Sequence, residues 1–164
     1  MITIRQAIAT DFDIIREIAF QTWPITYGAI LSKEQLCFML NKFYSLEYLN
    51  LNAQQNQLFF IISENEIPLG FLGIEHHFDK KSITKIHKIY VLPDRQRKGI
   101  GKSAIDFVVK SALENHSNKV ILNVNRFNQA VSFYQKMDFK IVQQIDIAIG
   151  NNYLMEDFVM ERLL

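Results

Sequence analysis

The sequence predicts one domain over residues 1–164, of the mixed α/β (α+β) class, with a largely antiparallel central sheet and helices on both of its faces. Three observations lead to this expectation. Residues 57–92 hold three strand patterns separated only by short polar turns, which is typical of an antiparallel meander. A strand–helix–strand pattern follows, and such a crossover places parallel strands in the same sheet. The six glycines and three prolines are scattered, so no linker divides the chain.

The N-terminal part is expected to form one strand followed by helices. Residues 1–5 alternate apolar and polar side chains, as a short strand does. Thr10 or Asp11 can cap a helix whose apolar residues recur at helical spacing, and Pro24 is expected to end that helix. Ser32 opens a capping box for a second helix.

The rest of the chain first forms the meander and then alternates helices with strands. Polar turns at residues 64–66 and 79–82 separate the first strands, and Pro93 ends the third one. Residues 99–116 place apolar side chains along one helical face. The expected strands are 57–63, 68–78, 83–92, 119–124, 139–149 and 153–163, and the expected helices are 45–52, 99–116 and 128–137.

The composition excludes several classes of protein. Of the 164 residues, 49% are hydrophobic and 21% are charged, which is typical of a globular chain rather than a disordered one. A net charge of +1 argues against a basic nucleic-acid-binding protein, and one cysteine cannot form an internal disulfide or a Cys-rich zinc site. The longest apolar run, residues 58–62, is too short to span a membrane, and the N-terminus lacks the apolar core of a signal peptide. We therefore expect a cytoplasmic protein that binds no nucleic acid, membrane or metal.

The most informative segment, residues 86–105, combines an apolar strand, a basic loop and a helix that opens with Gly99 and Gly101. The start of a helix exposes unpaired N–H groups with a partial positive charge, and glycines let a phosphate approach that backbone closely. The segment therefore predicts a binding site for an anion, most simply a pyrophosphate. The basic residues around it are Arg95, Arg97, Lys98 and Lys102.

Three families use such a site. The Walker-loop pattern does not match, because the position of its first glycine is occupied by Gln96. The dinucleotide fingerprint G-x-G-x-x-A is matched by Gly99, Gly101 and Ala104, but the loop before it is long and residues 123–125 offer no acidic side chain for a ribose. The third pattern is Q/R-x-x-G-x-G, and Gln96, Gly99 and Gly101 match it.

With this third pattern between a strand and a helix, the chain resembles the GNAT superfamily of N-acetyltransferases. Residues 125–139 are similar to that family's second signature, N-x-x-A-x-x-F-Y-x-K-x-G-F, with Asp138 in place of the usual glycine. The resemblance covers most of the chain and is weakest over residues 20–55. The N-terminal layout and residues 153–160 are similar to the bacterial spermidine/spermine N-acetyltransferase branch.

The resemblance implies that acetyl-CoA binds as cosubstrate in a gap where two central parallel strands splay apart. The strand would offer backbone groups to the pantetheine, and the glycine-containing loop would hold the pyrophosphate. A tyrosine in the second signature, here Tyr134, often protonates the leaving thiolate. The residues expected to contact acetyl-CoA are Ile89, Tyr90, Val91, Gln96, Arg97, Lys98, Gly99, Ile100, Gly101, Lys102, Asn128 and Tyr134.

The implied reaction is direct attack of a neutral amine on the thioester, with no metal. The Val91 N–H would polarise the carbonyl, and Tyr134 would protonate the sulfur. Many relatives carry a glutamate where this chain has His87, so His87 is expected to act as the base, with Glu75 or a chain of waters as alternatives.

The acceptor and the activity stay open at this point. A polyamine, another small amine or a protein N-terminus could accept the acetyl group. A non-catalytic acyl-CoA-binding sensor with the same fold is the alternative, and an oxidoreductase that uses the dinucleotide fingerprint is a third hypothesis. Many relatives pair through terminal strands, so the resemblance also makes a homodimer one possible state.

Overall fold

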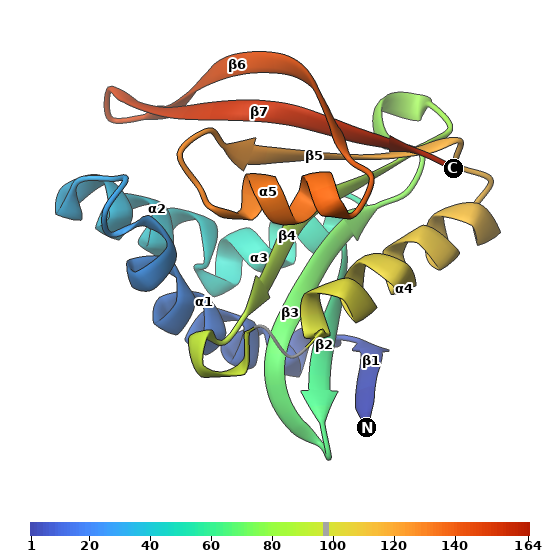
Figure 1. Cartoon of the computed structure of the whole chain (residues 1–164). Helices are drawn as coiled ribbons and strands as arrows, with labels where there is room; N and C mark the ends of the chain where they lie inside the picture. The colour runs from blue at the N-terminus through green and yellow to red at the C-terminus, as the bar shows by residue number, and fades with distance from the viewer. Residues whose placement is uncertain (97–98) are drawn as a thin grey trace.

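The computed structural model describes residues 1–96 and 99–164 (Figure 1). The strands are β1 (Ile2–Gln6), β2 (Leu58–Glu64), β3 (Ile67–Glu75), β4 (Ile83–Val91), β5 (Lys119–Asn125), β6 (Lys140–Gly150) and β7 (Tyr153–Leu163). The helices are α1 (Phe12–Tyr27), α2 (Lys33–Phe43), α3 (Leu46–Gln54), α4 (Ile100–Glu114) and α5 (Ala130–Lys136). Within these two described ranges, no helix is both long and apolar enough to cross a membrane.

The strands form one seven-stranded sheet in the order β1-β2-β3-β4-β5-β7-β6. Every neighbouring pair is antiparallel except β4 and β5, which are parallel. The predicted mixed and largely antiparallel sheet is therefore confirmed. The helix α4 makes the crossover that lets β4 and β5 run in the same direction.

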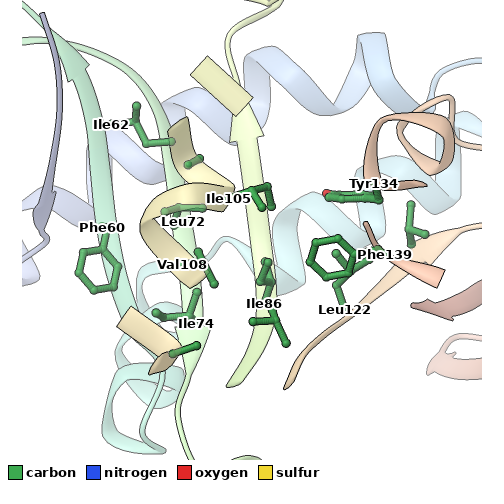
Figure 2. Close-up of a cluster of buried hydrophobic side chains, with 14 of the residues drawn as sticks. Phe60, Ile62, Leu72, Ile74, Ile86, Ile105, Val108, Leu122, Tyr134 and Phe139 are labelled. Carbon is green, nitrogen blue, oxygen red and sulfur yellow. The ribbon is translucent and has the colours of Figure 1, made fainter. Parts of the chain in front are cut away.

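Both faces of the sheet are covered by helices (Figure 1). Successive side chains of β2 point to opposite faces, so Phe59 and Ile61 pack in a cluster with α1, α2 and α3. Phe60 and Ile62 pack in a second cluster with α4 and α5, part of which Figure 2 shows. Because both faces are buried, the centre of β2 is continuously apolar rather than alternating.

The parallel strands β4 and β5 separate after a short stretch of pairing. Their register runs from Ile83 opposite Lys119 to Ile86 opposite Leu122. Each strand continues past this point in its pairing with its other neighbour, β3 or β7. The two strands therefore part in the middle of the sheet, as the resemblance implied.

The expectation that Pro24 ends the first helix is wrong, because α1 continues to Tyr27. A proline inside a helix removes one hydrogen bond, here the one to the carbonyl of Phe20, whose side chain lies at the surface. The helix resumes at once, since the Gly28 N–H donates to the Pro24 carbonyl at 3.0 Å. Burial of Trp23 and Tyr27 against the sheet offsets the lost bond.

The other elements lie close to their predicted positions. Ser32 accepts a hydrogen bond from the Gln35 N–H at 3.1 Å and caps α2 as expected. The strand β3 is shorter than predicted and ends at Glu75. After it, His77 and Asp79 take positive φ values of 53° and 55°, which a continuing strand does not allow.

Phe71 tests the packing between β3 and the helices of the first cluster. Its side chain is fully buried, with ring centroids 5.5 Å from Tyr90 and 5.9 Å from Tyr44. We expect Phe71→Ala to lower the free energy of unfolding by about 3–5 kcal/mol, measured by denaturant titration. Ile67→Ala, at the exposed start of the same strand, should cost less than about 1 kcal/mol. Equal losses in the two variants would contradict this account of the core.

Candidate active site

Beyond its last pairing with β5, β4 turns the backbone groups of two residues toward the gap between the strands. The Leu92 N–H donates to the Leu69 carbonyl at 2.8 Å, so position 92 turns its backbone toward β3. Backbone groups alternate in direction along a strand, so those of Ile89 and Val91 point away from β3. Nε2 of Gln96 donates to the Val91 carbonyl at 3.1 Å. An extended ligand in this gap can hydrogen-bond to β4 as a neighbouring strand would.

A β-bulge marks the point where β4 leaves β5. Gly73 lies opposite Lys88, whereas the next residue of β3, Ile74, lies opposite Ile86. His87 is therefore the extra residue on β4, just past the last residue that pairs with β5. Bulges re-aim side chains, and here both His87 and Lys88 line the same cavity, described below.

The start of α4 is open at one glycine and closely packed at the other. Gly99 has a φ of +76°, and a Cβ added to it would meet no atom within 4 Å. A Cβ added to Gly101 would lie 3.1 Å from the Cζ atom of Phe133 on α5. Gly99 therefore leaves room for a ligand beside the first N–H groups of α4, while Gly101 lets α5 pack closely.

The structure describes only part of the predicted basic loop. Arg97 and Lys98 lie outside the described residues. The Nζ atom of Lys102 lies 2.6 Å from Oδ2 of Asp106, one turn along α4. Ile100 is buried in the core, so only its backbone N–H can face an anion.

The second signature forms α5 and the loop before it. Oδ1 of Asn128 accepts a hydrogen bond from the Ala130 N–H at 2.8 Å and so fixes the start of the helix. Tyr134 is buried, its ring centroid 5.3 Å from that of Phe133 and 5.9 Å from that of Phe139. In Figure 2 its ring extends from α5 toward β4. Burial raises the pKa of Tyr134, so at neutral pH the hydroxyl is protonated and can donate.

A cavity of about 250 Å³ lies on the sheet face covered by α1, α2 and α3. Its walls include residues of β4 and β5 from beyond the point where these two strands stop pairing with each other. Its aromatic residues are Trp23, Tyr27, Phe43, Tyr44, Tyr48 and Tyr90, and its apolar residues are Met39, Ile147, Ile149 and Met155. Its polar residues are Asn52, Gln57, His87, Lys88, Asn123, Asn125 and Asp157.

The aromatic side chains of the cavity pack against one another. The hydroxyls of Tyr27 and Tyr90 lie 3.1 Å apart and share a hydrogen bond. The ring centroid of Trp23 lies 4.6 Å from that of Tyr27 and 5.5 Å from that of Tyr44. Burial raises the pKa of each of these three tyrosines, so all three are neutral at pH 7. The contact of Tyr90 with acetyl-CoA stays a prediction. Its side chain belongs to this aromatic wall, and its backbone groups alternate with those of Ile89 and Val91 and face β3.

Burial also lowers the pKa of the bulge residue His87 and of its neighbour Lys88, which leaves His87 neutral and Lys88 mostly charged at neutral pH. Burial, helped by the charges of Lys85 and Lys88, lowers the pKa of His87 to about 3. A neutral His87 can donate its Nε2–H to Oε2 of Glu75, which lies 2.9 Å away. Burial lowers the pKa of Lys88 to about 8, and its Nζ donates to Oε1 of Gln57 at 3.3 Å.

Sequence reasoning missed Asp157 on β7, which is 6% exposed and lines the cavity. Its strand partner is Asn125, in the part of β5 that has left β4. Burial raises the pKa of Asp157 to about 6, although the neighbouring Asn123 amide and the charge of Arg126 oppose the shift. A signal was present, because Glu156 and Asp157 are consecutive in a strand and one of two such side chains must point inward.

Comparison with known proteins identifies the family. A model of the Acetyltransferase (GNAT) family matches residues 13–139. The chain belongs to this family. The match includes both motifs that suggested the resemblance, and the parted strands and the open start of α4 fit a GNAT fold.

Two relatives of this GNAT chain are named as N-acetyltransferases. Spermidine N(1)-acetyltransferase of Thermoplasma acidophilum is 27% identical over 161 residues, which cover 94% of this chain and 96% of that protein. An uncharacterized N-acetyltransferase of Methanocaldococcus jannaschii is 25% identical over 143 residues, 84% of this chain. The chain spans only 60% of that second relative's length. Because the family and these relatives are acetyltransferases, this chain is an N-acetyltransferase as well.

Solved structures agree with the GNAT assignment. PaiA N-acetyltransferase from Thermoplasma acidophilum, in complex with coenzyme A, has a TM-score of 0.83 and 26% identity, with 100% of this chain and 99% of that chain covered. A GNAT-family acetyltransferase from Staphylococcus aureus has a TM-score of 0.74 at 16% identity, with 100% of this chain and 99% of that chain covered, which shows the shared fold alone.

The pKa of Asp157 leads to a prediction about stability. Folding raises the pKa of Asp157 from 3.8 to about 6. Ionising this buried carboxyl group therefore costs the folded protein stability, and the cost grows as the pH rises from 3.8 to about 6. Asp157→Asn removes this penalty. The variant should therefore gain up to about 2 kcal/mol relative to the native protein between pH 4 and pH 7, measured as the difference in thermal unfolding. If the difference in melting temperature between the variant and the native protein stays the same across this pH range, the raised pKa of Asp157 is contradicted.

Proposed function

We propose that this GNAT protein transfers the acetyl group of acetyl-CoA to the nitrogen of a primary amine, by direct attack of the amine on the thioester. The observation that carries the proposal is the separation of β4 and β5. It leaves a backbone edge for an extended cosubstrate, and the side chains of the same segments line a cavity large enough for a small amine. Support comes from PaiA, a relative of similar fold whose structure contains coenzyme A.

Acetyl-CoA is proposed to bind along β4 and at the start of α4. The pantetheine would hydrogen-bond to the backbone of Ile89 and Val91, whose groups face the gap. The pyrophosphate would meet the first N–H groups of α4 beside Gly99, where no side chain stands in the way. Further contacts are assigned to Tyr90, Gln96, Arg97, Lys98, Ile100, Gly101, Lys102 and Asn128.

The chemistry needs one donor for the carbonyl and one for the sulfur. The amine nitrogen attacks the thioester carbon, and the Val91 N–H stabilises the oxyanion that forms. The carbon–sulfur bond then breaks, and Tyr134 gives its proton to the departing thiolate. Burial keeps the Tyr134 phenol protonated at neutral pH, so it holds a proton when the thiolate leaves.

The base is proposed to be the pair of His87 and Glu75. The carboxylate of Glu75 can take a proton through the His87 ring, because the two side chains are hydrogen-bonded at 2.9 Å. Burial raises the pKa of Glu75 and so makes it a better proton acceptor than an exposed carboxylate. A water chain to the cavity is the alternative.

The release of free thiol from acetyl-CoA tests the proposed function. The amine panel contains spermidine, small monoamines and short peptides with free N-termini. We expect thiol release with at least one of these classes, at rates that rise with amine concentration. No release from any acceptor, while acetyl-CoA still raises the melting temperature, would contradict the proposal and favour a non-catalytic acyl-CoA-binding sensor.

Two substitutions of Gly99 test the cosubstrate site. Gly99→Glu places a carboxylate where the pyrophosphate is expected, so the Kd for acetyl-CoA should rise by about a hundredfold or more. Gly99→Gln is the matched control, because it has the same size and the same strain at positive φ. It should raise the Kd by less than about tenfold. If both variants bind equally, charge at this position is irrelevant and the anion site lies elsewhere.

Tyr134→Phe tests the proposed acid. Removal of the hydroxyl should lower kcat by about a hundredfold or more, since a general acid contributes that much. The ring stays in the core, so the melting temperature should change little and the Kd for acetyl-CoA by less than about threefold. An unchanged kcat would leave Tyr134 with packing as its only role.

A further inference from the structure

Three residues that line the aromatic cavity each carry one buried polar atom without a hydrogen-bond partner. Among the described residues, the buried side-chain nitrogen and oxygen atoms without a hydrogen-bond partner are Nε1 of Trp23, Nδ2 of Asn52 and Oδ1 of Asp157. All three residues line this one cavity. Buried polar atoms nearly always have a partner, because an unpaired one is costly. The gathering of these three residues around one cavity therefore points to a ligand that supplies the missing partners.

These atoms define a chemical pattern. Asp157 presents a carboxylate oxygen, which accepts hydrogen bonds and attracts a cation. Trp23 and Asn52 present N–H groups, which can only donate. The aromatic rings of Trp23, Tyr27 and Tyr44 in the lining also favour a cation over an anion. A matching ligand carries a positive donor at one point and a neutral acceptor at another.

The charges of the cavity allow one positive group but not two. Asp157 is the only carboxylate among the lining residues that the structure describes. The charged or titratable groups that interact electrostatically with the Asp157 carboxylate are Arg126, Lys85 and Tyr27. The cavity also contains His87 and Lys88, and a second ammonium would share the space with Lys88, while no second carboxylate belongs to the described lining residues to offset the repulsion.

We propose that the cavity binds a primary amine with a single ammonium group and a hydrogen-bond-accepting oxygen. Asp157 binds the ammonium, and the N–H groups of Trp23 and Asn52 donate to the oxygen. Amino amides, amino alcohols and peptide N-termini belong to this class, whereas polyamines do not. The binding of this amine is independent of the proposed function. Its use as the acetyl acceptor rests on the proposed function.

Three probes with the same four-carbon chain distinguish a plain monoamine, a diamine and an amino amide: butylamine, 1,4-diaminobutane and 4-aminobutanamide. Trp23 is the only tryptophan of the chain and lines the cavity, so its fluorescence reports binding directly. Titrations are made with saturating coenzyme A, which fills the cosubstrate site without allowing transfer. We expect 4-aminobutanamide to bind about tenfold more tightly than butylamine, and 1,4-diaminobutane to bind no more tightly than butylamine.

Variants assign the effect to the named atoms. Asp157→Asn should weaken all three probes by about tenfold or more, because it removes the charge that binds the ammonium. Glu156→Gln is the matched control: the same change of charge on the neighbouring residue of β7, whose side chain is 49% exposed and pairs with Arg126. It should leave binding unchanged. Asn52→Leu should remove most of the preference for 4-aminobutanamide and leave the affinity for butylamine intact.

Two results would overturn the inference. One is tighter binding of 1,4-diaminobutane than of 4-aminobutanamide by the native protein, a result that needs no variant to fold. The other is an Asp157→Asn variant that binds all three probes as the native protein does. Thiol release from acetyl-CoA with the same probes tests the proposed function separately. The expected binding pattern without thiol release would support the amine site and contradict acetyl transfer.

Discussion

The separation of β4 from β5 is the constraint on which the rest of the site depends. The two strands pair only from Ile83 to Ile86, and the bulge at His87 follows at once. A continuous ladder would use the backbone groups of Ile89 and Val91 and would close the space beside them. The parted strands instead leave those groups facing a gap. Other side chains of β4 and β5, such as Tyr90 and Asn125, line a cavity together with the helices α1, α2 and α3. The hydrophobic clusters on both faces keep the sheet intact despite the lost pairing.

Burial shifts the titratable groups of the site toward their neutral forms. It raises the pKa of Tyr134 and Asp157 and lowers that of His87 and Lys88. A low-polarity site of this kind favours the loss of a proton from a bound ammonium, and the neutral amine is the form that attacks the thioester. The same burial makes each remaining charge selective. A single carboxylate in such a cavity discriminates between amines more strongly than an exposed one would.

The family and the specificity depend on different parts of the chain. The motifs around Gly99 and Tyr134 are shared with the family and concern acetyl-CoA and the leaving thiolate. The cavity combines side chains from α1, α2, α3, β4, β5, β6 and β7, and neither motif includes Trp23, Asn52 or Asp157. Two GNAT proteins can therefore share the cosubstrate site and differ in the amine that they accept.

The sequence by itself determined the order of the strands and helices along the chain, the start of α4 and the family, because these signals are local. A capping serine such as Ser32 or a Gly-x-Gly at a helix start acts within a few residues of chain. Only the tertiary structure decided that Pro24 lies inside α1, because the burial of Trp23 and Tyr27 outweighs one lost hydrogen bond. It alone brought Asp157 to the cavity. That contact depends on β7 lying beside β5, a pairing between residues far apart in the chain that no local pattern specifies.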